Sequence, residues 1–176
     1  RAQDNPDELK NNDEVFSKCY DHLKKDGVIL IFPEGISLTN RQLKKIKTGA
    51  ARIALGAEAA NAFTLNVRIV SIGLNYSDPH NFRSDVFINI DEPIEVMNSK
   101  ARYSENDIAA VNKMTDEIRS RLEKHIIAIE DAAIDELVKK IEIIYKSQLL
   151  KDLGYTPKIK EHDFIVTKAI NEEVHY

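Results

Sequence analysis

The sequence of 176 residues has few cysteine and aromatic residues and no tryptophan, and these shortages limit what the protein can be. With Cys19 as its single cysteine, the chain can form no internal disulfide and offers no cysteine cluster for a metal ion. Aromatic residues make up 7% and the formal net charge is -4, whereas nucleic-acid binding usually needs a basic domain with interleaved aromatic residues. No segment approaches the roughly 18 consecutive apolar residues of a membrane-spanning helix.

Glycine motifs for phosphate binding are also missing. Neither Gly-x-x-x-x-Gly-Lys nor Gly-x-Gly-x-x-Gly follows a strand-like run, which argues against a nucleotide-binding protein. What remains is a globular composition, with 43% hydrophobic and 31% charged residues. A chain of this length can bury the core of one domain of ordinary size.

The segment around Glu34 is the most informative part of the sequence. An apolar run over residues 28–32 predicts a strand that is buried on both faces. Pro33 should end this strand, because proline has no N–H to donate to a sheet. Glu34 and Gly35 are then held at the carboxyl end of a strand, which is the usual place for a site in an α/β protein.

A basic segment follows directly. Residues 35–57 contain no Asp or Glu, although the chain as a whole is acidic. This local excess of positive charge indicates an anionic ligand near the end of the strand. The basic residues of the segment are Arg41, Lys44, Lys45, Lys47 and Arg52.

Two blocks of this sequence resemble a known family. Phe32-Pro33-Glu34-Gly35, followed by a polar loop and Lys47-x-Gly49-Ala50-Ala51-Arg52, is similar to the third sequence block of the glycerolipid acyltransferases. Residues 69–76 resemble the fourth block, with Ser71 where the family usually has proline. The resemblance covers roughly residues 1–96. It implies acylation of glycerol-3-phosphate or lysophosphatidate, in which a hydroxyl attacks an acyl thioester of coenzyme A or acyl carrier protein.

The catalytic block of that family, His-x-x-x-x-Asp, lies upstream of the Phe-Pro-Glu-Gly block. The only earlier histidine is His22, and Gly27 stands five residues after it. We therefore expect the catalytic pair to precede Arg1 in a longer protein, and this chain alone to be inactive. A second match to the spacing, His80 to Asp85, follows the fourth block, and we interpret it as a loop histidine and a strand-edge aspartate.

The resemblance assigns acceptor binding to this chain. A carboxylate would repel a phosphate, so Glu34 is expected to accept a hydrogen bond from the glycerol hydroxyl or to orient a cation. Gly35 would let the backbone approach the phosphate closely. Ser37 stands where many relatives have arginine, so either another cation makes the phosphate contact or the acceptor differs. The expected substrate-binding residues are Glu34, Gly35, Arg1, Ser37, Arg41 and Lys47.

The expected fold is α/β, a partial acyltransferase-like mixed, mainly parallel sheet with flanking helices, followed by long C-terminal helices. Residues 1–100 would form the C-terminal part of the acyltransferase domain, residues 101–153 a long amphipathic helical segment and residues 154–176 a polar tail. The patterns predict helices at 13–25 and 49–61, strands at 28–32, 67–75 and 86–90, and a short extended piece at 94–96.

The C-terminal part of the sequence leaves alternatives open. Residues 105–153 contain no glycine or proline, so two helices broken near 128–133 and one helix of about 45 residues fit equally well. Ser104 to Asp107 resembles a capping box, and the tail has room for one more helix after Asp163. Core packing is the main interpretation of these helices, with a dimer interface or a membrane-surface contact as alternatives.

The expected partners are the acyl donor as co-substrate and a phosphorylated glycerol acceptor, with no bound cofactor, metal or nucleic acid. The full-length protein would act at the cytoplasmic face of a membrane, and this chain alone would be soluble. Self-association through a sheet edge or the long helices is a further expectation. The rival hypothesis is a non-catalytic acyltransferase-like scaffold for assembly or membrane docking.

Overall fold

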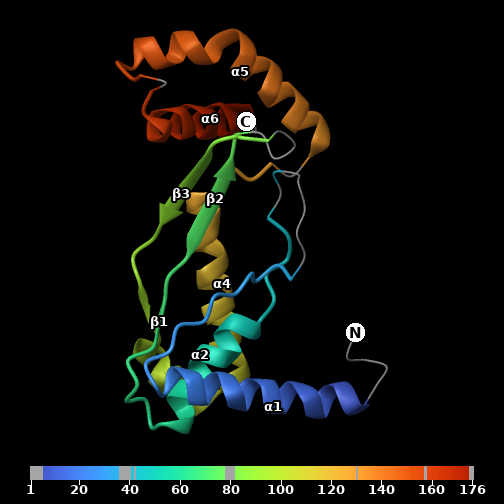
Figure 1. The fold of residues 1–176 in the computed structure, drawn as a ribbon, viewed down its shortest axis with the longest axis vertical. Helices are drawn as coiled ribbons and strands as arrows, with labels where there is room; N and C mark the ends of the chain where they lie inside the picture. Colours follow the sequence, from blue (N-terminus) through green and yellow to red (C-terminus); the bar gives the residue numbers. More distant parts are fainter. Residues whose placement is uncertain are drawn as a thin grey trace. The chain divides into compact units, whose positions relative to one another are not determined.

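The computed structural model describes residues 6–35, 41, 43–77, 82–129, 131–156 and 158–174 (Figure 1). The described residues form two compact units, each with its own buried side chains. The first unit contains the described residues of 1–36, 46–71 and 92–119. The second contains those of 37–45, 72–91 and 120–176.

The first unit is built from helices and one short pair of strands. Its elements are α1 (Pro6–Leu23), α2 (Gly49–Ala60), β1 (Arg68–Ile69), β4 (Ile94–Glu95), the 3-10 helix η1 (Val96–Ser99), α3 (Lys100–Glu105) and the first part of α4 (Asp107–His125). The predicted helix at 49–61 and the extended piece at 94–96 are thus confirmed to within one residue. The helix predicted at 13–25 is also present, but α1 begins seven residues earlier than predicted.

Helix α2 packs closely because its residues are small. Ala51, Ala54, Leu55 and Ala57 are buried on it. The hydroxyl of Tyr20 on α1 lies where a Cβ at residue 56 would have to be, so a larger residue there would displace the Tyr20 ring.

Helix α2 also carries a fully buried carboxylate. Glu58 Oε1 accepts a hydrogen bond from the Val67 N–H at 2.6 Å, and Oε2 accepts one from the Leu65 N–H at 3.2 Å. A buried carboxylate is tolerated when backbone N–H groups satisfy it. The side chain therefore fixes the turn after α2 and the start of the following strand.

The predicted strand at 28–32 does not form. Val28, Leu30 and Phe32 are 89%, 76% and 68% exposed, whereas Ile29 and Ile31 are half-buried. The segment is extended, but no backbone hydrogen bond joins residues 29–31 to another described residue. A strand exists only where a neighbouring strand pairs with it, and the apolar run alone does not supply that neighbour.

The expectation of a mainly parallel sheet is also wrong. Both described sheets are two-stranded and antiparallel, β1 with β4 and β2 (Ile72–Tyr76) with β3 (Val86–Ile90). The connection between β2 and β3 is short, which imposes an antiparallel hairpin, since a parallel pair needs a crossover of a dozen or more residues. The predicted strand at 86–90 is confirmed, and the one at 67–75 is divided into β1 and β2.

One face of the β2–β3 hairpin carries only aliphatic and aromatic side chains. The register pairs Ile72 with Ile90, Leu74 with Ile88, and Tyr76 with Val86. These six side chains are 40% to 68% exposed. The opposite face carries Gly73, Asn75, Phe87 and Asn89.

Two C-terminal helices form the core of the second unit. α5 (Ala132–Asp152) packs against α6 (Lys160–Val174), around the buried residues Ile129, Val138, Leu150, Val166 and Ile170 (Figure 1). The break between α4 and α5 confirms the two-helix alternative. The stretch expected as a polar tail contributes α6 to this core.

The helix starts differ from the predicted capping box. Ser104 lies inside α3, where its hydroxyl donates to the Lys100 carbonyl. Asn106 is the residue before α4, and its Oδ1 accepts a hydrogen bond from the Ala109 N–H at 2.8 Å. Asp131 caps α5 in the same way, accepting from the Ala133 N–H at 2.6 Å. Asn and Asp are preferred at this position because their short side chains reach the first free N–H groups.

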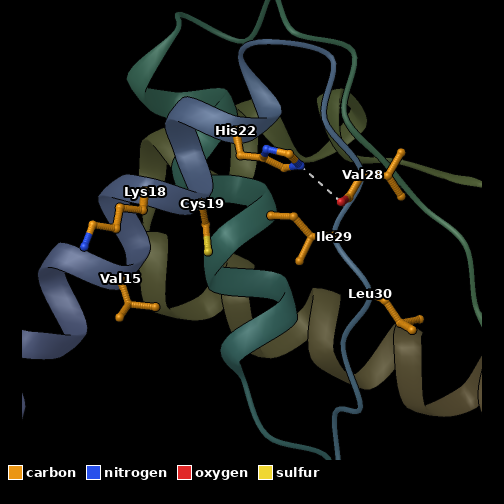
Figure 2. A pocket seen from close by; sticks show the side chains of 7 residues that line it. All are labelled: Val15, Lys18, Cys19, His22, Val28, Ile29 and Leu30. Carbon is orange, nitrogen blue, oxygen red and sulfur yellow. Dashed lines mark hydrogen bonds between the residues drawn. The ribbon is translucent and has the colours of Figure 1, made fainter.

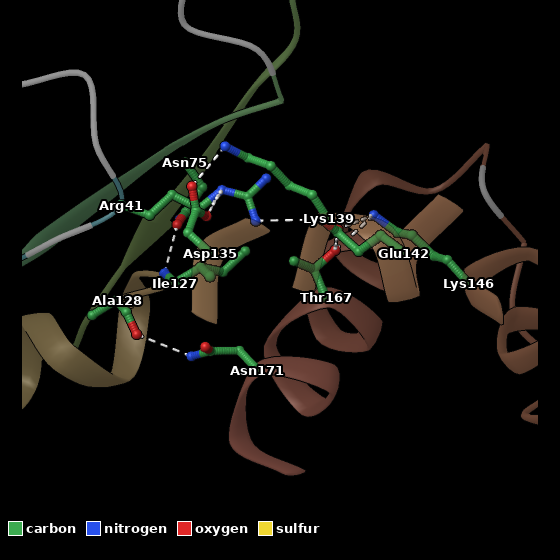
Figure 3. Close-up of polar contacts among 10 residues, drawn as sticks. All are labelled: Arg41, Asn75, Ile127, Ala128, Asp135, Lys139, Glu142, Lys146, Thr167 and Asn171. Atoms are coloured by element: carbon green, nitrogen blue, oxygen red, sulfur yellow. Dashed lines mark hydrogen bonds and ion pairs between the residues drawn. The ribbon is translucent and has the colours of Figure 1, made fainter. Parts of the chain in front are cut away.

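Side-chain amides satisfy the carbonyl groups at the end of α4. Asn75 and Asn89 of the hairpin donate to the His125 carbonyl at 2.9 and 3.2 Å. Asn75 also accepts from the Ile127 N–H, and Asn171 of α6 donates to the Ala128 carbonyl (Figure 3). The last carbonyls of a helix have no partner within the helix, so these amides hold the end of α4 in place.

Lys168 of α6 completes this arrangement. Its ammonium group donates to the carbonyls of Glu123 and Lys124, where the negative end of the helix dipole favours a cation. Burial lowers the pKa of Lys168, and the charge of Glu172 partly opposes that shift.

Candidate functional site

The predicted site begins in a turn of the first unit. The Gly35 N–H donates to the Phe32 carbonyl at 3.1 Å, which closes the turn around Pro33 and Glu34. The Lys47 N–H donates to the Pro33 carbonyl at 2.9 Å. Pro33 and Lys47, which are more than ten positions apart in the sequence, therefore meet beside Glu34. This contact joins the Phe-Pro-Glu-Gly motif to the start of the Lys-x-Gly-Ala-Ala-Arg motif.

Gly35 and Lys47 are in direct contact. Gly35 has φ +69°, a conformation that glycine adopts easily and most other residues avoid. A Cβ at this position would lie 2.5 Å from Lys47 Nζ, so the ammonium group lies directly over the glycine backbone. An ammonium group beside an accessible backbone suits an anion, because it supplies charge and lets the ligand approach closely.

Glu34 lies between Pro33 and Gly35 in this turn and is half-buried. The structure thus brings together three of the six predicted substrate-binding residues, Glu34, Gly35 and Lys47. Arg1 and Ser37 lie outside the described residues.

Arg41 has a different environment, in the second unit. Its guanidinium lies 3.4 Å from a Glu142 carboxylate oxygen and 3.9 Å from one of Asp135 (Figure 3). Its carbonyl accepts a hydrogen bond from the Ile129 N–H. The charge of Arg41 is therefore compensated by two carboxylates of α5, which would compete with an anionic substrate.

The Glu142 carboxyl is held in its ionised form. Burial alone would raise the pKa of Glu142. The hydrogen bond from Thr167 and the positive charges of Lys146 and Arg41 outweigh burial and keep that pKa below its ordinary value of 4.5.

Of the other basic residues, Lys45 and Lys47 are exposed, and Lys44 is half-buried. Arg52 packs its guanidinium over the Phe16 ring, 4.7 Å from the ring centre, so it takes part in the packing of α1 on α2. The histidine of the His80 to Asp85 match lies outside the described residues. Asp85 directly precedes β3, and its N–H donates to the Ser77 hydroxyl. This position confirms the interpretation of Asp85 as a strand-edge aspartate.

An apolar groove of about 400 Å³ lies between α1 and the extended segment (Figure 2). Ile29 points toward α1 and Leu30 points away from it. His22 Nε2 lies 3.2 Å from the Val28 carbonyl oxygen and ties the two sides together. The lining residues are Val15, Lys18, Cys19, His22, Val28, Ile29 and Leu30.

One polar cluster in the second unit was not predicted from the sequence. His125 Nε2 and the Arg121 guanidinium each lie 3.2 Å from an Asp91 carboxylate oxygen. Because Asp91 follows β3 directly, this cluster fastens the hairpin to the end of α4. A Pro two residues after an Asp at a strand end is a turn signal, but nothing in the sequence pairs it with residues 30 positions away.

Within the residues that the structure describes, no group of three or more His, Cys, Asp or Glu side chains could bind a metal ion. In the same residues, no helix combines the length and the hydrophobicity needed to cross a bilayer.

Comparison with known proteins points to one class. The family model named Acyltransferase matches residues 4–75, which include both the Glu34 turn and Lys47. Glycerol-3-phosphate O-acyltransferase 1 of Saccharomyces cerevisiae is 32% identical over 137 residues, 76% of this chain and 18% of that protein. Glycerol-3-phosphate O-acyltransferase 2 of the same yeast is 37% identical over 113 residues, 64% of this chain and 15% of that protein.

The chain thus spans only a small part of the length of these relatives, and no solved structure matches it. The chain belongs to the glycerolipid acyltransferase family.

Proposed function

We propose that the protein containing this chain transfers a fatty acyl group from acyl-CoA or acyl carrier protein to a hydroxyl of glycerol-3-phosphate or lysophosphatidate. The observation that carries the proposal is the turn in which Lys47 Nζ lies over Gly35, beside Glu34. Two yeast relatives that are named glycerol-3-phosphate O-acyltransferases support the choice of acceptor class.

The residues of this chain would bind the acceptor. The phosphate would lie against the Gly35 backbone and the Lys47 ammonium group, where charge-assisted hydrogen bonds are strong. Glu34 would accept a hydrogen bond from a glycerol hydroxyl and so orient it for attack. The general base that removes the hydroxyl proton would come from a His-x-x-x-x-Asp block outside residues 1–176, as the family resemblance implies.

The test is acyl transfer from labelled acyl-CoA by the protein that contains this chain, with glycerol-3-phosphate and lysophosphatidate as separate acceptors. Lys47→Met should raise the acceptor KM roughly tenfold and leave kcat nearly unchanged, because a contact to the non-reacting phosphate mainly contributes binding. Lys113→Met, which removes an exposed lysine of α4, is the matched control and should leave KM unchanged. Equal KM values for the wild type and Lys47→Met would contradict phosphate binding at this turn.

The scaffold hypothesis remains the rival, and the exposed apolar face of the β2–β3 hairpin favours it. The acyl-transfer assay distinguishes the acyltransferase from the non-catalytic scaffold. Absence of transfer to either acceptor by the wild-type protein would favour the scaffold.

A further inference from the structure

The groove between α1 and residues 28–30, here called the α1 groove, is lined mostly by apolar side chains (Figure 2). Val15, Cys19 and His22 line it from α1 at spacings of four and three residues, which places them on one side of the helix. Its volume of about 400 Å³ lies within the range of small-molecule sites, roughly 300–1,000 Å³. Such a groove suits an apolar ligand.

The α1 groove is closed at one end. There His22 Nε2 lies 3.2 Å from the Val28 carbonyl oxygen, and the Gly27 N–H donates to the His22 carbonyl at 3.0 Å. From this end the segment runs past Leu30 to the turn at Gly35, which belongs to the same unit. An extended chain spans at most roughly 17 Å over the five residues from Leu30 to Gly35. The closed end is therefore the end that lies farther from the turn along the segment.

An apolar path leads from the α1 groove to the turn. Val28, Leu30 and Phe32 alternate along the extended segment and so share one side of it, and all three are mostly exposed. Directly after them, the Lys47 N–H donates to the Pro33 carbonyl. Contiguous apolar side chains in water mark a binding surface, because a bound apolar group would remove them from water. This path ends at the lysine that is proposed to bind phosphate.

We propose that the α1 groove binds the fatty acyl chain of the thioester donor, and that Cys19 and Leu30 help to set its preferred length. This proposal rests on the proposed function. With the acceptor phosphate at Gly35 and Lys47, the acyl chain runs back along the segment toward the closed end. Each buried methylene changes affinity about fourfold, so the length of the groove selects the length of the chain.

The first experiment measures acyl transfer to glycerol-3-phosphate by the protein that contains this chain, from coenzyme A thioesters of saturated chains of increasing length. The kcat/KM of the wild type should rise about twofold to fourfold per methylene and level off once the chain fills the groove. Cys19→Phe places a ring between Val15 and His22 and should move this plateau to shorter chains.

A matched pair of substitutions tests the apolar path. Leu30→Gln removes an exposed apolar side chain, so it should lower kcat/KM for palmitoyl-CoA roughly tenfold and leave that for butyryl-CoA unchanged. The KM for glycerol-3-phosphate should stay the same. Ile108→Gln changes a similarly exposed residue of α4 in the same unit, outside the lining of the groove, and should alter none of these values. Thermal melting of each variant keeps the comparison to folded protein.

Binding without catalysis is measured at Cys19, which is half-buried and lines the α1 groove. Its alkylation by N-ethylmaleimide is followed by mass spectrometry of the peptide that contains it. Palmitoyl-CoA at about ten times its Kd should slow the alkylation roughly tenfold, because only the unoccupied groove reacts, and coenzyme A alone should not slow it. Protection by lysophosphatidate but not by palmitoyl-CoA would overturn the proposal and assign the groove to the acceptor.

The activity measurements separate this proposal from the proposed function. The same chain-length profile in the wild type, Cys19→Phe and Leu30→Gln would overturn the binding of the acyl chain in the α1 groove. Protection of Cys19 by palmitoyl-CoA without acyl transfer to either acceptor would instead overturn the reaction and leave the groove as an acyl-binding site.

Discussion

Buried hydroxyl groups in this protein differ in whether they have a hydrogen-bond partner. Ser71 is 4% exposed, and its Oγ has no partner among the described residues. Thr167 is 3% exposed, and its hydroxyl bonds both Glu142 and Lys146. Ser71 stands where relatives usually have proline, which has no hydroxyl to satisfy.

These two residues form a matched pair for measurement. Ser71→Ala should leave the free energy of unfolding unchanged or raise it by up to about 1 kcal/mol, because it removes an unsatisfied polar group. Thr167→Val should lower it by about 1–3 kcal/mol, because it leaves two charged groups without a hydroxyl partner. Urea unfolding of both variants checks the opposite signs, and a large loss in Ser71→Ala would show that its hydroxyl has a partner in solution.

At the scale of the elements, helices and most strand positions could be predicted from the sequence, whereas the pairing of the strands could not. The apolar spacing in α1, α2, α4 and α5 repeats every three to four residues, and a helix forms its hydrogen bonds within its own segment. The run at 28–32 has a strand composition, but its hydrogen bonds must come from elsewhere in the chain. The positions of β2 and β3 were close to the prediction because each is an apolar segment, but their antiparallel pairing was not predicted.

The close approach of β2 to the end of α4 gives a sharp test at this scale. A Cβ at Gly73 would overlap the His125 carbonyl oxygen, which Asn75 and Asn89 hold in place. Gly73→Ala should therefore lower the free energy of unfolding by about 2 kcal/mol or more, as urea unfolding would measure.

Gly49→Ala is the control for this substitution. Gly49 opens α2, and a Cβ added there would meet no atom within 4 Å. Alanine at this position should raise the free energy of unfolding by less than about 1 kcal/mol, because alanine has a higher helix propensity than glycine. Equal effects of the two substitutions would contradict the close contact at Gly73.

At the scale of the whole molecule, the proximity of residues within the family block could be predicted, and their role in binding stays a prediction. Gly35 and Lys47 were expected to bind one ligand, and the structure places them in contact. The surroundings of Arg41 could not be predicted, since its partner Glu142 lies 101 residues further along the chain. A cationic segment indicates an anion, but only the fold decides whether that anion is a substrate or a carboxylate of the protein.

The ion pairs and the hydrogen bond around Glu142 also make the free energy of unfolding depend on pH in a definite direction. Glu142 has a pKa below 4.5 in the folded protein, so between that pKa and 4.5 the unfolded chain binds more protons than the folded one. Its contribution to stability is therefore complete above pH 4.5 and is lost as the pH falls through the folded pKa. The groups that face it are Arg41 from the loop, Lys146 from α5 and Thr167 from α6.

Urea unfolding between pH 7 and pH 3 tests this dependence. Glu142→Gln should be less stable than the wild type at pH 7, and the difference should shrink as the pH falls below 4.5, because only the wild type loses an ionised carboxylate there. Glu136→Gln is the control on the same helix. The pKa of Glu136 is also lowered, by the hydrogen bond and charge of Lys140, but the group is fully exposed and solvent weakens its effect on stability. A constant difference between the wild type and Glu142→Gln across the range would mean that Arg41 and Lys146 do not hold the charge of this carboxylate in solution.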